Sequence, residues 1–535
     1  MFDSERVDPV VKIWRDWQAI GKLSLMTRRT FLHTPVAAAA QSSLSKPAST
    51  SASAPPNILL LMADQMTPFM TGPYGQRAAH TPNLDRLARS GSVFENAYCN
   101  SPLCVPSRTS MFTGRLVSKI GAFDNASEFR AEWPTWNHYL RDAGYRTAVA
   151  GKCHFIGPDQ LHGFDERLTD CIFPASFAML PDWRRGAYLN PGTSVQAMLR
   201  MLGPSKWTRQ LAFDEMVFDR AIGRLREYAL GKQEQPLFLN VSFTQPHDPF
   251  TTTRKFLDLY KDTEIPLPKD HGDIRKLSET YEWFVIHHGI NLAHLTPERI
   301  REARLNYLAM ISWVDDRVGH ILDELARLGL DRNTVVIFTS DHGEMLGEHG
   351  QWSKRLLLEW SARVPLIVSA PGRLPAGKRI RGLVSLADLF PTFAELAGVK
   401  VETQLDGSSL LPLLSGTEAG DGREVISEYL GEGSLEPMRM LRQKQYKYII
   451  VNGYPPQLYD LKEDPEETRN VAGQPAYASA EKALRERIER DWDGAALKRE
   501  VFTSQGRRRV VGSIGQHGQA PHWDYNVVEP GPFKG

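Results

Sequence analysis

The stretch CVPSRTSMFTGR, residues 104–115, places a cysteine, a proline and a closing glycine in an order that predicts a short helix. Helix-compatible residues run from Ser107 to Phe112, after Pro106 and before Gly114. Proline favours the first turn of a helix and glycine the position just past its end, so Cys104 is expected at the helix N-terminus. Free N–H groups and the helix dipole favour negative charge there, which suits a nucleophile or an anion beside one. A structural cysteine before an ordinary helix is the alternative.

Four apolar runs elsewhere in the chain each end at polar residues that can bind ligands or transfer protons. The runs, interpreted as buried strands, are Ile58 to Met62, Arg146 to Ala150, Leu237 to Phe243 and Thr334 to Thr339. The polar residues that follow them are Asp64, Lys152 with His154, His247, and Asp341 with His342. In open α/β sheets ligands bind at the carboxyl ends of strands, so these residues are expected to converge on one site. Taken singly, such a residue after a strand is usually just a turn residue or a helix cap, and the argument depends on all four coinciding with the cysteine motif.

Helical patterns alternate with these strands, which predicts an α/β fold with helices on both faces of the sheet. The expected helices are Pro82 to Gly91, Trp136 to Ala143, Ala212 to Leu230 and Ile300 to Leu328, with a further strand at Leu366 to Ala370. The character of the sequence changes after Val399. Two antiparallel strands, Met438 to Val451 and Gln457 to Leu461, and a helix from Ala478 to Asp491 are expected there.

The chain therefore divides into four predicted parts. Residues 1–56 are an export signal and a disordered linker, and residues 57–415 form the domain that carries the site. Residues 416–500 form a smaller C-terminal subdomain, an antiparallel sheet with a helix. Residues 501–535 form an extended tail that is basic at Arg507 to Arg509 and rich in glycine and proline.

The N-terminal part looks like a twin-arginine export signal, in which Arg28 and Arg29 precede a small apolar run that ends at Ala40. The Ser/Ala/Pro-rich residues 41–56 follow as a linker. These features predict a periplasmic or exported protein. The alternative is a chance arginine pair in a cytoplasmic protein. Met26 is an alternative start to Met1.

Composition excludes several partners. The 535 residues carry a formal net charge of +1, which gives no indication of binding to nucleic acid or to an anionic membrane surface. No apolar run reaches the roughly 18 residues needed to span a bilayer. Four cysteines, namely Cys99, Cys104, Cys153 and Cys171, are too few for a disulfide-built scaffold, although any one pair could bridge.

The full pattern C-x-P-S-R with T-G-R resembles the signature of the sulfatase family. Residues 57 to about 490 fit that family, which opens with an apolar strand ending at aspartate. The matching motifs are Asp64, Tyr74-Gly75, Thr81 to Ala88 (TPNLDRLA), Gly151 to His154 (GKCH) and Asp341 to Glu344 (DHGE). The resemblance implies an alkaline-phosphatase-like fold, a large mixed sheet sandwiched by helices.

The resemblance also implies a metal site and a modified residue. In sulfatases this cysteine, here Cys104, is oxidised to formylglycine by a separate maturation enzyme. The metal is usually Ca²⁺, which prefers oxygen ligands. By matching motifs, its ligands are Asp64, Asp341, His342 and the modified Cys104. Gln65 stands where many sulfatases have a further aspartate, and its amide carbonyl is a candidate ligand.

The implied reaction is hydrolysis of a sulfate monoester with cleavage of the S–O bond. A hydroxyl of the hydrated formylglycine attacks sulfur, and Arg108 and Lys152 stabilise this nucleophile. His247 and Lys354 contact the sulfate and the leaving oxygen, where a general acid is worth about 10²–10⁴-fold. His154 deprotonates the second hydroxyl and so expels sulfate.

Within the family the chain resembles the choline sulfatases. The strings that carry this resemblance are MADQMTPFMTGPYG, NAYCNSPLCVPSR, GPDQLHGF and PHDPF, and the tail residues Ser504 to Arg509 and Trp523 to Tyr525. In those enzymes the tail helps to build the oligomer and reaches a neighbouring active site. The chain is therefore expected to form a homo-oligomer, a dimer or tetramer, and Asp524 is a candidate substrate contact. A solvated basic tail is the alternative. Asn125 is a second candidate substrate contact, or else a turn residue.

The expected substrate is a small-molecule sulfate ester, choline sulfate or a related alkyl sulfate. Choline sulfatases hold the trimethylammonium group with aromatic and acidic residues. Met179 and Leu189 stand where that branch would supply a tryptophan and a histidine, so the cage is either incomplete or rebuilt from Trp183, Tyr188 or Trp207. The alternatives are an arylsulfatase or sugar sulfatase, a phosphonate monoester or phosphodiester hydrolase of the same superfamily, and a non-catalytic binding relative.

Overall fold

The computed structural model describes residues 55–231, 234–270 and 272–514, and this part contains an eight-stranded sheet of order β10-β2-β9-β8-β1-β6-β3-β4. Four neighbouring strands in it are those predicted from the apolar runs: β8 (Thr334–Ser340), β1 (Asn57–Ala63), β6 (Leu237–Ser242) and β3 (Arg146–Gly151). They pair in parallel, and the register sets Met62 of β1 beside Ser242 of β6 and Thr339 of β8. Their carboxyl ends therefore meet at one edge of the sheet.

The other half of the sheet makes it mixed. β9 (Leu366–Ser369) runs antiparallel to β8 and to β2 (Ser92–Tyr98), while β10 (Lys378–Ser385) is parallel to β2. β2 and β10 were not expected from the sequence, because charged residues interrupt or precede their apolar positions. Those charges pair with each other, as in the 2.7 Å contact of Arg379 Nε with Glu95 Oε1. β4 (Glu166–Arg167) completes the other edge.

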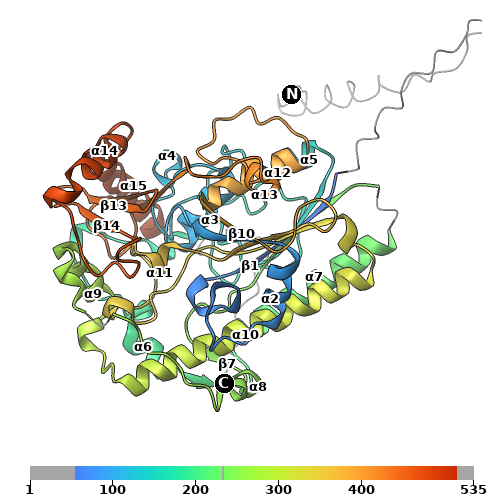
Figure 1. The fold of residues 1–535 in the computed structure, drawn as a ribbon, viewed down its shortest axis with the longest axis horizontal. Helices are drawn as coiled ribbons and strands as arrows, with labels where there is room; N and C mark the ends of the chain where they lie inside the picture. Colours follow the sequence, from blue (N-terminus) through green and yellow to red (C-terminus); the bar gives the residue numbers. More distant parts are fainter. Residues whose placement is uncertain (1–54, 232–233, 271, 515–535) are drawn as a thin grey trace, which may run out of the picture. The chain divides into compact units, whose positions relative to one another are not determined.

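Helices cover both faces, as predicted, because successive strand residues point to opposite sides. In β1, Leu59 and Leu61 belong to one buried apolar cluster and Ile58 and Leu60 to another. Figure 1 shows α7 and α10 on one side of the sheet and α5, α12 and α13 on the other. The helices of the first face are α2 (Pro82–Ser90), α7 (Arg209–Leu230) and α10 (Pro297–Arg327). Those of the second are α3 (Cys104–Thr113), α5 (Trp136–Asp142), α12 (Leu389–Leu396) and α13 (Leu411–Ser415).

Shorter elements connect these layers. They are α4 (Val117–Ile120), α6 (Val195–Arg200), α8 (Arg254–Leu257), α9 (Glu282–His288), α11 (Glu359–Ala362), and the two-stranded pair β5 (Gly203–Pro204) and β7 (Thr251–Thr252).

The predicted C-terminal antiparallel sheet with a helix is confirmed, with more strands than expected. Its strands are β11 (Glu424–Tyr429), β12 (Met438–Gln443), β13 (Tyr446–Val451) and β14 (Gln457–Asp460), and α14 (Ala478–Glu489) packs on one face. The expected single strand Met438 to Val451 is a hairpin, because the chain turns at Lys444, which has a positive φ of 50°. No glycine or proline marks that turn in the sequence.

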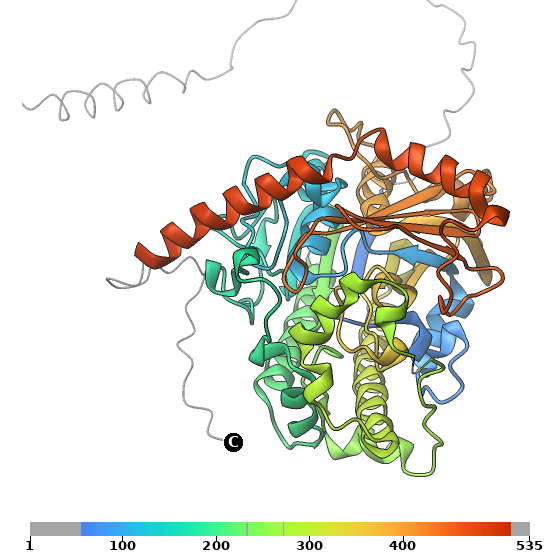
Figure 2. The ribbon, with the colours of Figure 1, turned by 90° about the vertical axis from the view of Figure 1, so that its left-hand side faces the viewer.

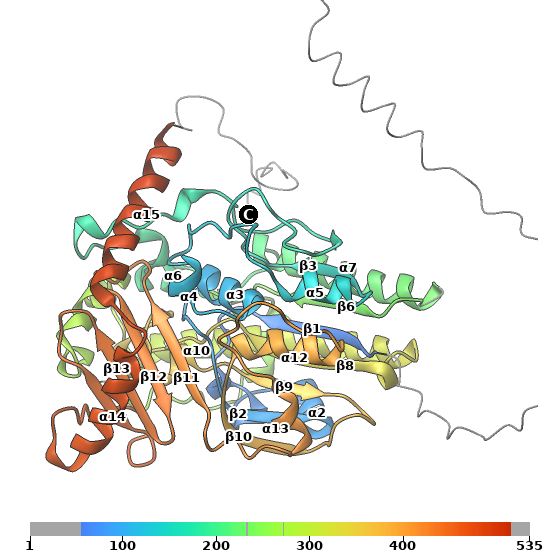
Figure 3. The same ribbon diagram turned by 90° about the horizontal axis from the view of Figure 1, so that it is seen from above.

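The last described element is the helix α15 (Gly494–Ile514). Residues 501–514, which were expected in an extended tail, are therefore helical. Figures 2 and 3 show α15 running from the C-terminal sheet toward the segment that follows β3. The candidate export signal at Arg28 and Arg29 and the candidate substrate contact Asp524 lie outside the described residues. Export and a role of the tail in an oligomer remain predictions.

Within the described residues, no helix is both long and apolar enough to cross a membrane. The four cysteines are free thiols.

Candidate active site

Cys104 is the first residue of α3 and is buried, so the helix starts two residues before Pro106. The helix ends at Gly114, whose φ of 64° lies in the left-handed region that glycine tolerates. Two contacts fix its N-terminal end. Asn125 Oδ1 accepts a hydrogen bond from the N–H of Val105 (3.0 Å), and Ser107 Oγ donates to the carbonyl of Asp341 (2.5 Å). The cysteine is thereby held against the end of β8.

Cys104, Asp64, Asp341 and His342 form a buried group whose ligand atoms all lie within 4.8 Å of one another. Cys104 Sγ lies 3.2 Å from His342 Nε2 and 3.9 Å from Asp64 Oδ1. The N–H at Nδ1 of His342 faces the carbonyl of Gly343 at 3.0 Å, which leaves Nε2 free to bind a cation. Burial and the neighbouring Asp341 carboxylate raise the pKa of Asp64. A divalent cation would relieve this repulsion, so the donor set fits a metal ion.

Two basic side chains hold the carboxylates in place. Lys152, which follows β3, pairs with Asp64, and both are fully buried. Arg108 of α3 donates from Nε to Asp341 Oδ2 (2.8 Å) and from its terminal nitrogen to the carbonyl of Lys152 (2.6 Å). Arg108 therefore links the ends of β8 and β3.

The electrostatic environment of residue 104 favours an anion. Burial by itself raises the pKa of the Cys104 thiol, but the charges of Lys152, Lys354 and His342 outweigh it and lower the pKa well below its usual value. The same charges would act on an oxygen nucleophile at this position.

His154 is a neutral base at the end of β3. Burial lowers the pKa of His154 to about 4. Its ring stacks on Phe173, with centroids 4.6 Å apart, and its backbone N–H donates to Cys171 Sγ at 3.3 Å. Its positive φ of 55° turns the chain sharply just after the strand. Phe173 has no signal in the sequence, because it reaches the site from an irregular loop.

His247 and Lys354 lie together on the other side of the group. Lys354 Nζ is 2.6 Å from His247 Nε2, and the N–H at Nδ1 of His247 faces the carbonyl of Asp248 at 2.7 Å. Burial and the Lys354 charge lower the pKa of His247, but the carboxylates of Asp248 and Asp64 outweigh them and raise it.

Gln65 contacts the site through both ends of its side chain. Its amide oxygen accepts from Lys354, and its amide nitrogen donates to Glu344 and, at 3.2 Å, to Asp248 Oδ1. Its backbone N–H donates to Asp341 Oδ1 at 3.1 Å. The amide is thus hydrogen-bonded to its neighbours, and its role as a metal ligand remains a prediction.

Glu432 and Arg355 also contact the site, although no sequence motif predicted them. Asn125 Nδ2 donates to Glu432 Oε1 at 3.1 Å, so Asn125 links Glu432 to the start of α3. Arg355 lies 3.5 Å from the same oxygen and 3.1 Å from His288 Nε2. Glu432 comes from the loop after β11 in the C-terminal sheet, and only the packing of that sheet brings it here.

The candidate cage residues occupy different surroundings. Met179 and Leu189 are 40% and 38% exposed, and Trp207 is 54% exposed. Trp183 is buried and donates from its indole N–H to the carbonyl of Gly431 at 3.0 Å. Tyr188 lies edge-on to His287, with centroids 6.0 Å apart. The three aromatic candidates thus range from a buried to an exposed side chain.

Comparison with known proteins identifies this arrangement. The family model described as "Sulfatase" matches residues 56–399, which is more than half of the chain. The chain belongs to the sulfatase family. A second model, "N-sulphoglucosamine sulphohydrolase, C-terminal", matches residues 347–493 of this sulfatase. The predicted family and enzyme class are confirmed.

The sulfatase is similar to a curated choline-sulfatase of Rhizobium meliloti (strain 1021). The two are 38% identical over 501 residues, which cover 89% of this chain and 94% of that protein. It is 29% identical to arylsulfatase K of Homo sapiens over 442 residues, or 78% of this chain and 79% of that protein. Among solved structures, the phosphonate monoester hydrolase of Agrobacterium radiobacter is similar, with a TM-score of 0.67 and 25% identity over 83% of this chain and 96% of that chain. The predicted alkaline-phosphatase-like fold is confirmed.

Proposed function

We propose that this sulfatase hydrolyses the sulfate monoester of a small alcohol, with choline sulfate as the first candidate. The supporting observation is one buried group, Asp64, Cys104, Asp341 and His342, beside the bases and cations that a sulfate ester needs. The similarity to a choline-sulfatase over nearly the whole chain supports the choice of alcohol.

The proposed cofactors are formylglycine, made from Cys104, and Ca²⁺. Asp64, Asp341, His342 and the modified residue 104 would hold the cation; the two carboxylates are ligands that calcium prefers. Such a cation supplies charge that stabilises sulfate oxygens and acidifies an oxygen nucleophile. Formylglycine supplies that oxygen in hydrated form, in place of the thiol.

Different side chains of the protein would carry out the two proton transfers of the reaction. The His247–Lys354 pair carries a proton between nitrogens 2.6 Å apart and can deliver it to the leaving alcohol oxygen. His154 is neutral and can accept a proton from residue 104. Lys152 supplies positive charge beside the nucleophile, while Arg108 acts by orienting Asp341 and the Lys152 backbone.

The position of Glu432 supports a substrate whose alcohol part carries a positive charge, such as choline sulfate. Its carboxylate is buried, joins Asn125 beside the nucleophile helix, and leaves Oε2 without a hydrogen-bond partner within the described residues. A trimethylammonium group would find a complementary charge there. The ring of Phe173 already stacks on His154 and lies 4.5 Å from Lys152 Nζ, so the support for a cationic group comes from Glu432.

A larger substrate is the second candidate, favoured by a different observation. Arg355 already balances the charge of Glu432, and Met179 and Leu189 leave exposed apolar surface where an aromatic cage is expected. A polar, hydroxyl-rich alcohol such as a sugar sulfate would suit an Arg–Glu pair, since both can bond to hydroxyl groups.

The deciding experiment is a substrate panel on the purified, metal-loaded enzyme: choline sulfate, an aryl sulfate, a sugar sulfate and a phosphonate monoester. We expect choline sulfate to have the highest kcat/KM and Cys104→Ala to abolish turnover. Peptide mass spectrometry should show residue 104 as formylglycine. A sulfate ester other than choline sulfate with the highest kcat/KM overturns the choice of alcohol. An unmodified Cys104 with no turnover of any ester would support a non-catalytic relative instead.

A further inference from the structure

Helix α15 meets the active-site wall through one buried ion pair. Arg508 donates from its two terminal nitrogens to the two oxygens of Asp124, at 2.5 and 2.8 Å. Asp124 is fully buried and the Arg508 side chain is 8% exposed. Parallel bonds of this kind fix both distance and orientation. The pair joins residues that are 384 positions apart in the chain.

Because Asp124 and Asn125 are adjacent in one tight turn, fixing Asp124 also fixes the position of Asn125. Asp124 Oδ1 also accepts the N–H of Ala126 at 2.9 Å, and Ser127 Oγ accepts the N–H groups of Phe123 and Asp124 at 2.9 and 3.0 Å. These bonds close a tight turn around Asn125. The side chain of Asn125 then bonds to the N–H of Val105 and to Glu432. Arg508 thus acts on the nucleophile helix and on Glu432 through two intervening residues.

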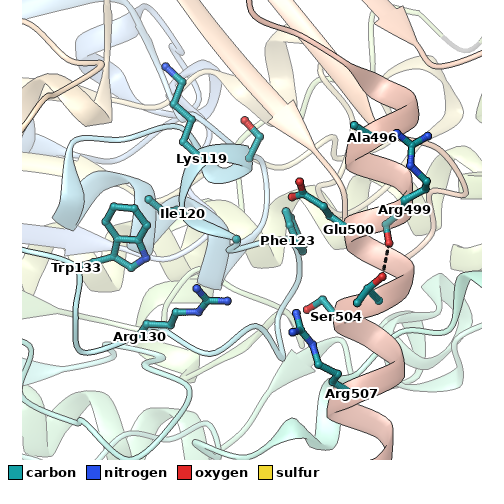
Figure 4. Close-up of a pocket in the computed structure, with 13 residues that line it drawn as sticks. Lys119, Ile120, Phe123, Arg130, Trp133, Ala496, Arg499, Glu500, Ser504 and Arg507 are labelled. Carbon is teal, nitrogen blue, oxygen red and sulfur yellow. Dashed lines mark hydrogen bonds between the residues drawn. The ribbon is translucent and has the colours of Figure 1, made fainter.

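The rest of the contact between α15 and this wall combines a cavity with an apolar cluster. A cavity of about 470 Å³ lies between α15 and residues 118–133, and Figure 4 shows Glu500 and Arg507 of the helix facing it. Beside the cavity, Val501 of α15 is buried in an apolar cluster with Phe123 and Trp183. The other members of the cluster are Val117, Ile120, Ala122 and Leu430. Gln505 Oε1 accepts the backbone N–H of Trp183 at 3.1 Å. Within the described residues, the Arg508–Asp124 pair is the hydrogen-bonded contact between α15 and this turn.

We propose that Arg508 is a positioning residue for the substrate's alcohol group, acting through Asp124 to hold Asn125 between residue 104 and Glu432. The inference rests on the proposed sulfate-ester hydrolysis but not on which alcohol is used. It gives part of the basic run Ser504 to Arg509 a role in the active site of its own chain. Without Arg508, the Asp124 carboxylate is left buried without its cation, which favours movement or hydration of the turn.

The first test is a double-mutant cycle on the sulfate ester that the wild type hydrolyses best. Arg508→Ala should lower kcat/KM by up to about 10²-fold, mainly through KM, because small displacements of positioning groups have effects of that size. Arg508→Lys should recover only part of the loss, since lysine cannot form both bonds at once. In an Asn125→Ala background, Arg508→Ala should have little further effect.

The matched control is Arg507→Ala, one residue earlier in the helix, where the side chain lines the cavity. It should keep the kcat/KM of the wild type. Additive losses from Arg508→Ala and Asn125→Ala would overturn the proposal, as would an unchanged KM in Arg508→Ala. If Arg508→Ala does not fold, Arg508→Lys and Asp124→Asn serve in the same cycle.

Hydrogen exchange separates this inference from the proposed function. Arg508→Ala should speed exchange at the amides of Ala126 and Ser127, and Arg507→Ala should not. If the wild type hydrolyses no sulfate ester, the proposed function fails while this exchange result still decides whether Arg508 holds the turn. Unchanged exchange at these amides contradicts the proposal whatever the substrate.

Discussion

Asp214 on α7 shows how one buried carboxylate shapes the loop that leads to His247. Its oxygens accept the N–H of Thr244 (2.8 Å), the hydroxyl of Thr244 (2.9 Å) and the N–H of Gln245 (2.9 Å). Burial outweighs these bonds and raises the pKa of Asp214 to about 7 from 3.8. The folded protein therefore holds this proton more tightly than the unfolded chain does.

This shift predicts a pH dependence of stability. The folded pKa lies above the unfolded one, so the contribution of Asp214 to the free energy of unfolding is fully present below about pH 4 and is lost as the pH rises toward 7. Urea denaturation at pH 5 and pH 8 should show a smaller fall in stability for Asp214→Asn than for the wild type. Asp219→Asn, exposed on the same helix, should behave as the wild type does. An equal fall in wild type and Asp214→Asn would disprove the prediction.

At the scale of elements, a buried charge cluster joins the C-terminal sheet to the catalytic sheet. Lys447 of β13 lies 2.7 Å from Glu359 Oε1 of α11 and 2.7 Å from Glu467 Oε1. The N–H of Glu359 donates to Glu467 Oε2 at 2.7 Å, and Lys447 Nζ donates to the carbonyl of Leu357 at 3.1 Å. The cluster holds α11 close to β13, which pairs with β12, the strand after the Glu432 loop.

We expect Lys447→Met to destabilise the protein strongly. Removing the lysine leaves the buried Glu467 without a cation and Glu359 with Arg363 alone, 3.1 Å away. Breaking a buried pair in this way costs about 3–5 kcal/mol. Chemical denaturation measures the loss, and Lys462→Met, at an exposed position after β14, is the control. A loss no larger than that of the control would show that the cluster contributes little to stability.

At the scale of the whole molecule, the metal group joins segments that are far apart in the chain. Asp64 follows β1, Asp341 and His342 follow β8, and residue 104 begins α3. The unfolded chain cannot present these ligands together, so a bound metal stabilises only the folded state.

Removal of the metal should therefore lower Tm. Binding contributes about 2.7 kcal/mol when the free metal is at about 100 times its Kd. Thermal unfolding with a chelator, then with Ca²⁺ or Mg²⁺ restored, measures the effect and tests the identity of the ion. Asp341→Asn should make Tm much less sensitive to the chelator. A wild-type Tm that does not respond to chelation would count against a stabilising metal at this site.

The sequence by itself determined the central strands and the polar residues at their ends. β8, β1, β6 and β3 are buried on both faces, so each is a continuous apolar run, and a buried strand followed by Asp64 or Asp341 is a local signal. The resemblance carried by residues 104–115 then identified the reaction class, because that motif is contiguous in the chain. The hairpin at Lys444 and the strands β2 and β10 were not predicted, because these elements are stabilised by pairing with other strands and have no clear local pattern.

Only the tertiary structure decided which residues complete the site around that motif. Glu432, Arg355 and Phe173 come from loops without a pattern of their own, and they reach Cys104 and His154 because separate sheets and loops pack there. The helical form of residues 501–514 and the Arg508–Asp124 pair likewise depend on a contact across 384 positions. Such contacts are selected by packing and charge pairing in three dimensions, which leave no periodic trace in a single sequence.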